Sequence, residues 1–183
     1  MGVPFQFTGY VLQILYEKLN GREVVSNRHK ANKIQYLRLA MEKQAQYDRA
    51  YLEMAQVWGQ LSYCERKKVG ALIVKDRMII SDGYNGTPSG FENICEDDNY
   101  ETKWYVLHAE ANAILKVAAS TQSCKGATLY ITLSPCKECS KLIHQSGIKR
   151  VVYATAYKDL SGVEFLKKAG VEVQHFPLEK SEV

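Results

Sequence analysis

The pattern of apolar and polar positions predicts one long helix followed by a hairpin of two strands. Residues 34–61 are dominated by strong helix formers and contain a single glycine, Gly59, close to the end. We therefore expect one long helix there, or two helices that meet near Asp48. Residues 69–74 are apolar and rich in β-branched side chains, and residues 78–81 are largely apolar again after a short polar turn. This second pattern predicts an antiparallel hairpin.

Helices and strands alternate over the remaining part of the chain. The expected elements are a helix at 108–119, a strand at 127–132, a helix that opens at Pro135 and ends at Gly147, a strand at 150–154, a helix at 162–169 and a strand at 171–176. The first of these helices is apolar on nearly every side, which predicts that it is buried. Together with the hairpin, this order implies an α/β fold, a three-layer α/β/α sandwich around a mixed five-stranded sheet.

The 183 residues suffice for one compact domain and a modest extension. We assign the domain to residues 41–183 and the extension to residues 1–40, where the apolar stretch 10–16 predicts an accessory helix. Met41 lies in frame as an alternative start, and the chemistry described below lies after it.

The formal net charge of +4 lies entirely in the extension. Residues 1–40 hold six Lys and Arg against two Glu, whereas residues 41–183 hold eighteen residues of each sign. A domain that binds polynucleotide backbones usually carries a basic excess. The neutral domain therefore argues against RNA or DNA and favours a free nucleotide as substrate.

Neither a membrane span nor a secretion signal is visible in the sequence. No run approaches the ~20 apolar residues that cross a bilayer, and residues 1–5 lack a charged segment followed by an apolar one. Five cysteines are an odd number, and two of them form C-x-x-C, which favours metal binding in a reducing compartment over a disulfide framework. We therefore expect a cytoplasmic protein without a membrane partner.

Three candidate metal ligands stand in two short segments. His108 opens the segment His-Ala-Glu, and Cys136 and Cys139 stand in Pro-Cys-Lys-Glu-Cys. One imidazole and two thiolates are ligands that zinc prefers, and a site with three protein ligands keeps one position for water, as catalytic zinc sites do. Both segments are expected where a strand passes into a helix. A helix N-terminus lowers the pKa of a cysteine and so favours the thiolate.

Glu110 supplies the acid–base group that such a site needs. Zinc lowers the pKa of a bound water to about 7. A nearby carboxylate can take up the proton of that water and deliver it to a ring nitrogen and then to a leaving amine. The order His-x-Glu…Pro-Cys-x-x-Cys is the signature of zinc-dependent nucleobase deaminases. The alternative is a closed zinc module with Cys64 or Cys124 as fourth ligand, which leaves the carboxylate of Glu110 without a role.

Residues from about 48 to 176 resemble the deoxycytidylate (dCMP) deaminase family of the cytidine deaminase-like superfamily. The similarity is carried by residues 62–71, 83–88, 108–114, 132–139 and 145–153. It implies zinc-dependent hydrolysis of dCMP to dUMP and ammonia, which supplies dUMP for thymidylate synthesis. It also implies a homo-oligomer, typically a hexamer, and responses to dCTP and dTTP as effectors.

The same resemblance suggests three residues that contact the substrate. It implies that Asn85 contacts the sugar hydroxyl, and that Arg66 and Tyr157 lie in loops that approach the 5′-phosphate. Arg66 could equally be a solvated residue in the basic run 66–68. Tyr157 could equally have a packing role.

The other cysteines bear on a second metal site. Some members of the family carry a structural zinc that is bound partly by the loop before the His-Ala-Glu segment. In this chain that loop offers Cys95 and acidic residues but no histidine, and with Cys64 this makes two ligands, too few for a site. We therefore expect Cys64, Cys95 and Cys124 to be ordinary buried thiols.

Three other functions remain as alternatives. A tRNA adenosine deaminase shares both zinc-ligand segments, but the long insert at 89–107 and the neutral domain argue against it. A free cytidine deaminase usually has a cysteine at the position of His108. The non-enzymatic alternative is a zinc-stabilised binding module. Ammonia release from dCMP, cytidine and tRNA, assayed side by side, separates these functions.

Overall fold

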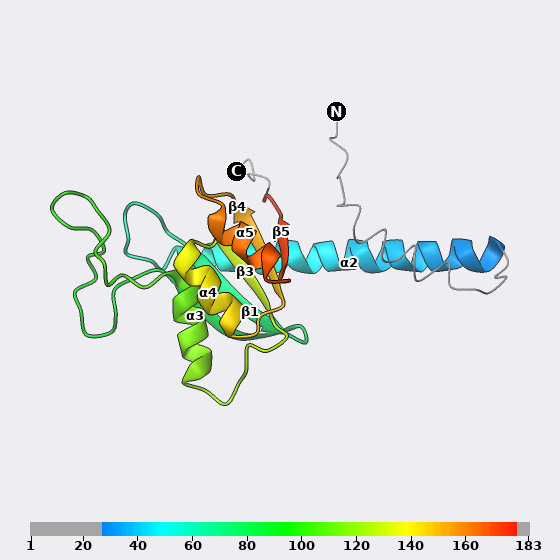
Figure 1. Ribbon diagram of the computed structural model, residues 1–183, viewed down its shortest axis with the longest axis horizontal. Coiled ribbons are helices and arrows are strands. Elements are labelled where there is room, and N and C mark those ends of the chain that lie inside the picture. Colours follow the sequence, from blue (N-terminus) through cyan, green and yellow to red (C-terminus); the bar gives the residue numbers. More distant parts are fainter. Residues whose placement is uncertain (1–26, 179–183) are drawn as a thin grey trace. The chain divides into compact units, whose positions relative to one another are not determined.

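The structure is a computed structural model that describes residues 27–178 (Figure 1). The chain divides into two compact units, Met1–Lys43 and Gln44–Val183. The accessory helix predicted at residues 10–16 lies outside the described residues. Among residues 27–178, no helix is both long enough and apolar enough to cross a membrane.

A mixed five-stranded sheet forms the centre of the second unit. Its strands are β1 (Gly70–Lys75), β2 (Met78–Tyr84), β3 (Thr128–Leu133), β4 (Arg150–Thr155) and β5 (Glu172–His175), in the order β2-β1-β3-β4-β5. Strand β1 pairs antiparallel with both β2 and β3, whereas β3, β4 and β5 run parallel. The predicted hairpin and the predicted mixed sheet are both confirmed.

Helices cover both faces of this sheet. They are α2 (Asn27–Gly59), α3 (Ala109–Ala118), α4 (Lys137–Gln145) and α5 (Ser161–Lys168). On one face, α3, α4 and α5 bury side chains such as Ile143 and Leu166 against alternate residues of β1, β3 and β4. On the other face, Leu52 of α2 packs against Tyr130 and the remaining alternate positions. Because strand side chains alternate between faces, the two clusters make the predicted three-layer sandwich.

Two boundaries and the burial of one helix differ from the sequence predictions. Helix α2 is continuous from Asn27 to Gly59, so it begins earlier than predicted and has no break near Asp48. Strand β2 continues to Tyr84, past the predicted end at residue 81. Helix α3 is not buried on all sides, because it covers the sheet with one side only and leaves the Leu115 side chain 53% exposed.

A buried ion pair joins α2 to the sheet. Asp48 is almost fully buried, and its two carboxylate oxygens accept hydrogen bonds from Arg150 Nη1 at 2.8 Å and Nη2 at 2.7 Å. The Tyr130 hydroxyl and Gln44 Nε2 donate to the same carboxylate at 2.8 and 2.9 Å. Burial by itself raises the pKa of Asp48, but the hydrogen bonds and charge of Arg150 outweigh it and lower that pKa overall.

Replacing Asp48 by alanine is expected to lower the free energy of unfolding by about 3 kcal/mol, because the buried Arg150 guanidinium then loses its buried, bidentate partner and keeps only the largely exposed Glu172 as an ionic partner. Urea denaturation of the variant measures the loss, and Glu53→Ala, at an exposed position of the same helix, is the control. Because the folded-state pKa of Asp48 is lowered, the wild-type protein keeps this stabilisation above pH 3.8, the ordinary value, and loses it as the pH falls further. A loss below about 1 kcal/mol would mean that the pair does not hold α2 in place.

Candidate active site

Three potential metal ligands converge where two helices begin. His108 is the N-cap of α3, Cys136 is the N-cap of α4, and Cys139 lies one turn further along α4. His108 Nδ1 lies 3.5 Å from the Cys136 sulfur and 3.4 Å from the Cys139 sulfur. The ligand atoms of all three residues lie within 4.8 Å of one another. One imidazole nitrogen and two sulfurs at this spacing fit a zinc ion with one coordination position left over.

Different kinds of segment bring the two ligand groups to this place. Cys136 follows β3 after a short turn, so the sheet positions it directly. His108 follows a long loop that begins after Tyr84. Two hydrogen bonds between the backbones of Gly86 and Leu107 hold the end of this loop beside its start, close to the end of β2. The prediction that a strand precedes each ligand group is therefore confirmed for Cys136 and wrong for His108. A single backbone bridge takes the place of the predicted strand.

Two glycines allow the helices that carry the ligands to pack closely. A Cβ atom on Gly83 of β2 would overlap the backbone of Ala109 and Ala113 in α3. A Cβ atom on Gly162 would likewise overlap the Pro135 carbonyl and the Ser140 hydroxyl at the start of α4. Larger residues at either position would push a ligand-bearing helix away from its neighbour.

Hydrogen bonds among the ligands favour one thiolate. The bond from Cys139 is the largest influence on Cys136 and contributes most to lowering its pKa to about 3. The same bond is the largest influence on Cys139 and raises the pKa of that thiol. The bond to Cys136 also raises the pKa of His108. The group therefore carries negative charge on a sulfur, which is the form that binds a metal cation.

Glu110 is a buried carboxyl group in the first turn of α3. Glu110 is only 3% exposed. Burial is the largest influence on the pKa of this carboxyl group and raises it. The charge of His108 acts in the opposite direction. A buried carboxyl group is costly unless it is paired or used, and this one lines the same cavity as His108 and Cys136. It lies beside the candidate metal ligands, where a carboxyl group could take up and release protons.

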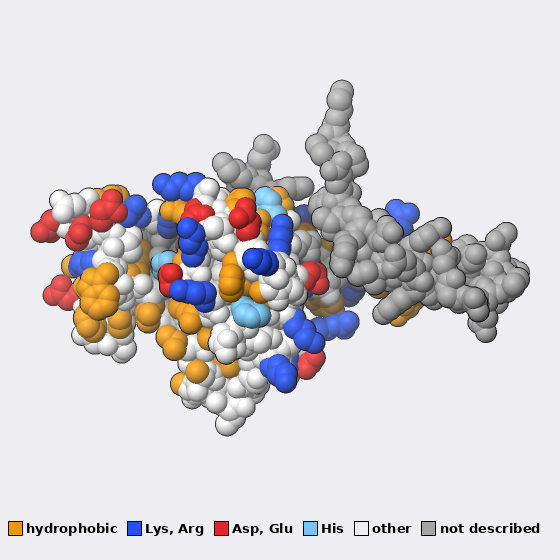
Figure 2. All heavy atoms as spheres, viewed as in Figure 1, with side chains coloured by type: hydrophobic (Ala, Val, Ile, Leu, Met, Phe, Trp, Pro, Cys, Tyr) orange, Lys and Arg blue, Asp and Glu red, His pale blue; other side chains and the backbone are white. Residues whose placement is uncertain are grey.

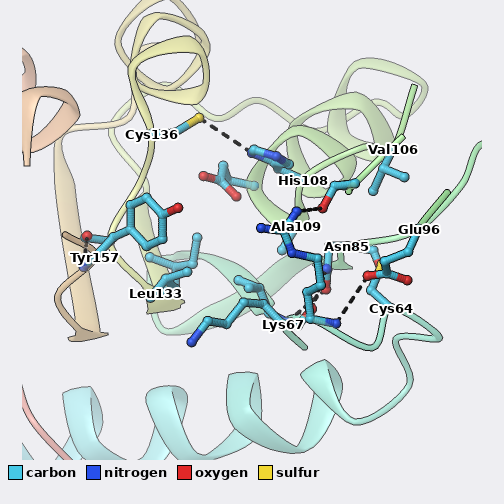
Figure 3. A pocket seen from close by; sticks show the side chains of 16 residues that line it. Cys64, Lys67, Asn85, Glu96, Val106, His108, Ala109, Leu133, Cys136 and Tyr157 are labelled. Carbon is cyan, nitrogen blue, oxygen red and sulfur yellow. Dashed lines mark hydrogen bonds between the residues drawn. The ribbon is translucent and has the colours of Figure 1, made fainter. Parts of the chain in front are cut away.

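The residues that the sequence suggested for the substrate line this cavity too. It has a volume of about 330 Å³, which is within the range of small-molecule sites. Figure 3 shows His108 and Cys136 on one side of it, Tyr157 and Leu133 on a second side, and Lys67 and Asn85 on a third. Arg66 and Glu110 also line it, whereas Cys139 lies behind the wall. All seven predicted site residues therefore lie in or directly behind one cavity.

Hydrogen bonds show what these substrate candidates contact within the protein. The amide of Asn85 is buried, accepts the N–H of Val69 at 2.8 Å and donates to the carbonyl of Lys67 at 2.7 Å. It therefore holds the backbone of the loop before β1. Arg66 Nη1 donates to Glu101 Oε2 at 2.7 Å, and the backbone N–H of Tyr157 donates to the Ser134 hydroxyl at 2.8 Å.

Sequence reasoning missed Glu96 and two other residues of the cavity. Glu96 is buried and lines the cavity, although it lies in an acidic stretch that looks like solvated loop in the sequence. Lys67 and Ser134 line it as well. Lys67 directly follows Arg66, and Ser134 lies two positions before Cys136. Their proximity to these predicted site residues was the signal in the sequence that could have identified them.

One prediction about the cysteines is wrong. Cys64 and Cys95 are not free thiols, because a disulfide joins them across a sequence separation of 31 residues. Cys124 is a buried free thiol, as predicted. Spacing in the sequence could not reveal the bond, because it links two irregular loops that the fold brings together.

Comparison with known proteins identifies the family. Residues 45–155 match the model of the cytidine and deoxycytidylate deaminase zinc-binding region. The chain belongs to this deaminase family. The deoxycytidylate deaminase of Enterobacteria phage T4 is 36% identical over 169 residues, which is 69% of this chain and 88% of the phage protein. The deoxycytidylate deaminase of Saccharomyces cerevisiae is 35% identical over 140 residues, 71% of this chain and 45% of the yeast protein.

A solved structure supports the same assignment within the deaminases. The dCMP deaminase from the cyanophage S-TIM5, crystallised with dCMP and dUMP, shares 46% sequence identity with a TM-score of 0.68. The match covers 69% of this chain and 94% of that one. The resemblance to dCMP deaminases is therefore confirmed, and so is the cytidine deaminase-like fold.

Proposed function

We propose that this protein hydrolyses dCMP to dUMP and ammonia. The observation that carries the proposal is one cavity that is lined by two of the three convergent potential metal ligands, His108 and Cys136, by the buried carboxyl group of Glu110, and by the cationic side chains of Arg66 and Lys67. The family relationship supports the same reaction, since the similar S-TIM5 enzyme was crystallised with dCMP and dUMP. The product would supply dUMP for thymidylate synthesis.

His108, Cys136 and Cys139 would hold the zinc ion, which is supported by the match to a zinc-binding region and by the convergence of their ligand atoms. When bound, zinc makes a water molecule acidic enough to supply hydroxide near neutral pH. The thiolate of Cys136 and the partial positive charge of the α4 N-terminus keep the sulfur ready to bind the cation.

Glu110 would carry protons between three positions. Its carboxylate accepts the proton of the attacking water and passes it to the ring nitrogen beside the carbon that carries the amine. In a second step Glu110 protonates the amine, which leaves as ammonia. Because burial raises the pKa of Glu110, its carboxyl group can hold the proton between these steps.

Arg66 and Lys67, which both line the cavity, would bind the 5′-phosphate. Lys67 lies across the cavity from His108 and Cys136 (Figure 3). Guanidinium–phosphate contacts are among the stronger hydrogen bonds in proteins. Asn85 would then serve the substrate in two ways, by holding the loop at residues 67–69 and by contacting the sugar hydroxyl. Tyr157 would form part of the cavity wall close to the bound 5′-phosphate.

A polynucleotide substrate has less support. Acidic and basic side chains are interspersed on the face of the molecule shown in Figure 2, and residues 41–183 carry no net charge. Nonspecific polynucleotide binding depends on many cationic contacts.

The resemblance to the deoxycytidylate deaminase family also leads us to expect that this protein assembles into a hexamer and is regulated by dCTP and dTTP. Light scattering tests the assembly, and rate measurements with each nucleotide test the regulation.

Replacing Arg66 by alanine is expected to raise KM for dCMP by about 10- to 100-fold, the loss of one charge-assisted contact. The turnover of deoxycytidine, which lacks the phosphate, should change far less. Lys68→Ala is the matched control, since Lys68 belongs to the same basic run but does not line the cavity. Steady-state kinetics of dCMP, deoxycytidine, cytidine and tRNA with wild-type protein and both variants test the assignment. Equal losses for dCMP and deoxycytidine in Arg66→Ala would contradict the phosphate contact.

A further inference from the structure

A disulfide lies at the wall of the cavity where the phosphate is proposed to bind. It joins Cys64, in the loop that leads to β1, to Cys95, in the long loop between β2 and α3. Both cysteines are buried, and Cys64 lines the cavity. We call the long loop between β2 and α3, residues 85–108, the outer loop. The disulfide therefore connects the outer loop covalently to the segment that carries Arg66 and Lys67.

Glu96, the residue after Cys95, makes a second connection between the same two loops. Its Oε1 atom accepts hydrogen bonds from the backbone N–H groups of Glu65 and Arg66, both at 3.2 Å. The carboxylate is buried, so these two bonds are shielded from water. Glu96 thus sets the direction of the backbone from which the Arg66 side chain leaves.

A third connection is exposed and depends on the other two. Arg66 Nη1 contacts Glu101 Oε2 at 2.7 Å and Thr102 Oγ1 at 3.4 Å, and the Glu101 side chain is 70% exposed. Exposed pairs contribute little by themselves. The disulfide at Cys95 is the one covalent bond among the three connections between these two loops.

We propose that the Cys64–Cys95 disulfide is a redox-sensitive link that, through Glu96, positions Arg66 for the substrate phosphate. The proposal rests on the proposed function, because the phosphate belongs to dCMP. Opening the link releases the outer loop, moves Glu96 away from the N–H groups of residues 65 and 66, and lowers the affinity of the site for a 5′-phosphate. Glu96 is a positioning residue in this scheme and does not touch the substrate.

A dithiol can open the link by thiol–disulfide exchange. Two electrons and two protons pass from the dithiol to the two sulfurs, which leaves Cys64 and Cys95 as thiols and the dithiol as a disulfide. The metal ligands are not oxidised or reduced in this step. The result is an enzyme that discriminates less between dCMP and deoxycytidine.

The first measurement is a thiol count on the full chain, denatured without reductant in the presence of a chelator. Three of the five cysteines should react, and all five should react after treatment with tris(2-carboxyethyl)phosphine. The phosphine becomes its oxide, while water supplies the oxygen and both thiol protons. Five reactive thiols before reduction would overturn the proposal.

The second measurement is the ratio of kcat/KM for dCMP to kcat/KM for deoxycytidine, with zinc content measured in each sample. Phosphine-treated wild-type protein, Cys64→Ser/Cys95→Ser and Glu96→Ala, which removes the acceptor for both N–H groups, should each lower this ratio by about tenfold, mainly through KM for dCMP. Cys124→Ser is the control, because Cys124 is a buried free thiol that does not line the cavity.

The outcomes separate this inference from the proposed function. An unchanged ratio, or equal losses for both substrates, would show that the bond supports the fold alone and would overturn the inference while the deaminase activity stands. Untreated wild-type protein that fails to deaminate dCMP would refute the proposed function, and the inference would fall with it.

Discussion

Replacing Glu110 by glutamine is expected to lower kcat for dCMP by about 10⁴-fold while zinc content and melting temperature stay close to wild type. General acid–base assistance is worth ~10²–10⁴-fold at one step, and Glu110 serves at more than one step. A 10⁴-fold loss corresponds to about 5.4 kcal/mol of activation free energy. Glutamine keeps the size of this buried side chain but cannot accept the proton of the water.

The matched control for this change is Glu138→Gln. Glu138 lies on α4 between the two cysteine ligands, is exposed and does not line the cavity. The Glu138→Gln substitution also removes a carboxyl group that lies within two positions of a candidate metal ligand in the sequence. It therefore separates the loss of proton transfer from a general electrostatic effect. Retention of a tenth of the wild-type kcat by Glu110→Gln would assign the proton-carrier role to another residue.

Replacing Cys136 by alanine is expected to remove zinc and with it all dCMP turnover above background. The variant keeps only His108 and Cys139 as ligands, which is fewer than zinc sites use. Because metal binding and folding share free energy, we also expect the melting temperature to fall by about 5 °C or more. Elemental analysis and thermal denaturation of the purified variant measure both effects.

Cys124→Ala controls for the loss of a buried sulfur. Cys124 is buried but lies outside the cavity, and it should keep one zinc per chain and full activity. Undiminished zinc in Cys136→Ala would exclude Cys136 as a ligand and would require a different metal site.

Part of the arrangement of the candidate metal ligands could be predicted from the sequence because it is local. Cys136 and Cys139 share a face of α4 as a consequence of helical spacing, and His108 and Glu110 are fixed by one turn of α3. The positions of the five strands along the chain also followed from periodicity, since alternation and helical spacing persist over whole elements. These features depend on neighbours within a few residues.

The features that the sequence did not predict depend on contacts between distant segments. The disulfide joins loops 31 residues apart, and Glu96 is buried only because the outer loop folds against residues 65 and 66. Helix α2 runs through Asp48, whose carboxylate is paired with Arg150, 102 residues away. Local propensity contains no information about such partners.

The most direct test of this account is the conversion of dCMP by purified protein of known zinc content. The account predicts that dUMP and ammonia form in equal amounts, and that the rate rises in proportion to zinc across partly loaded preparations. Glu110→Gln loaded with zinc to the same level should form neither product at a comparable rate. Fully loaded wild-type protein that leaves dCMP unchanged, or metal-free protein that converts it at the full rate, would contradict the account.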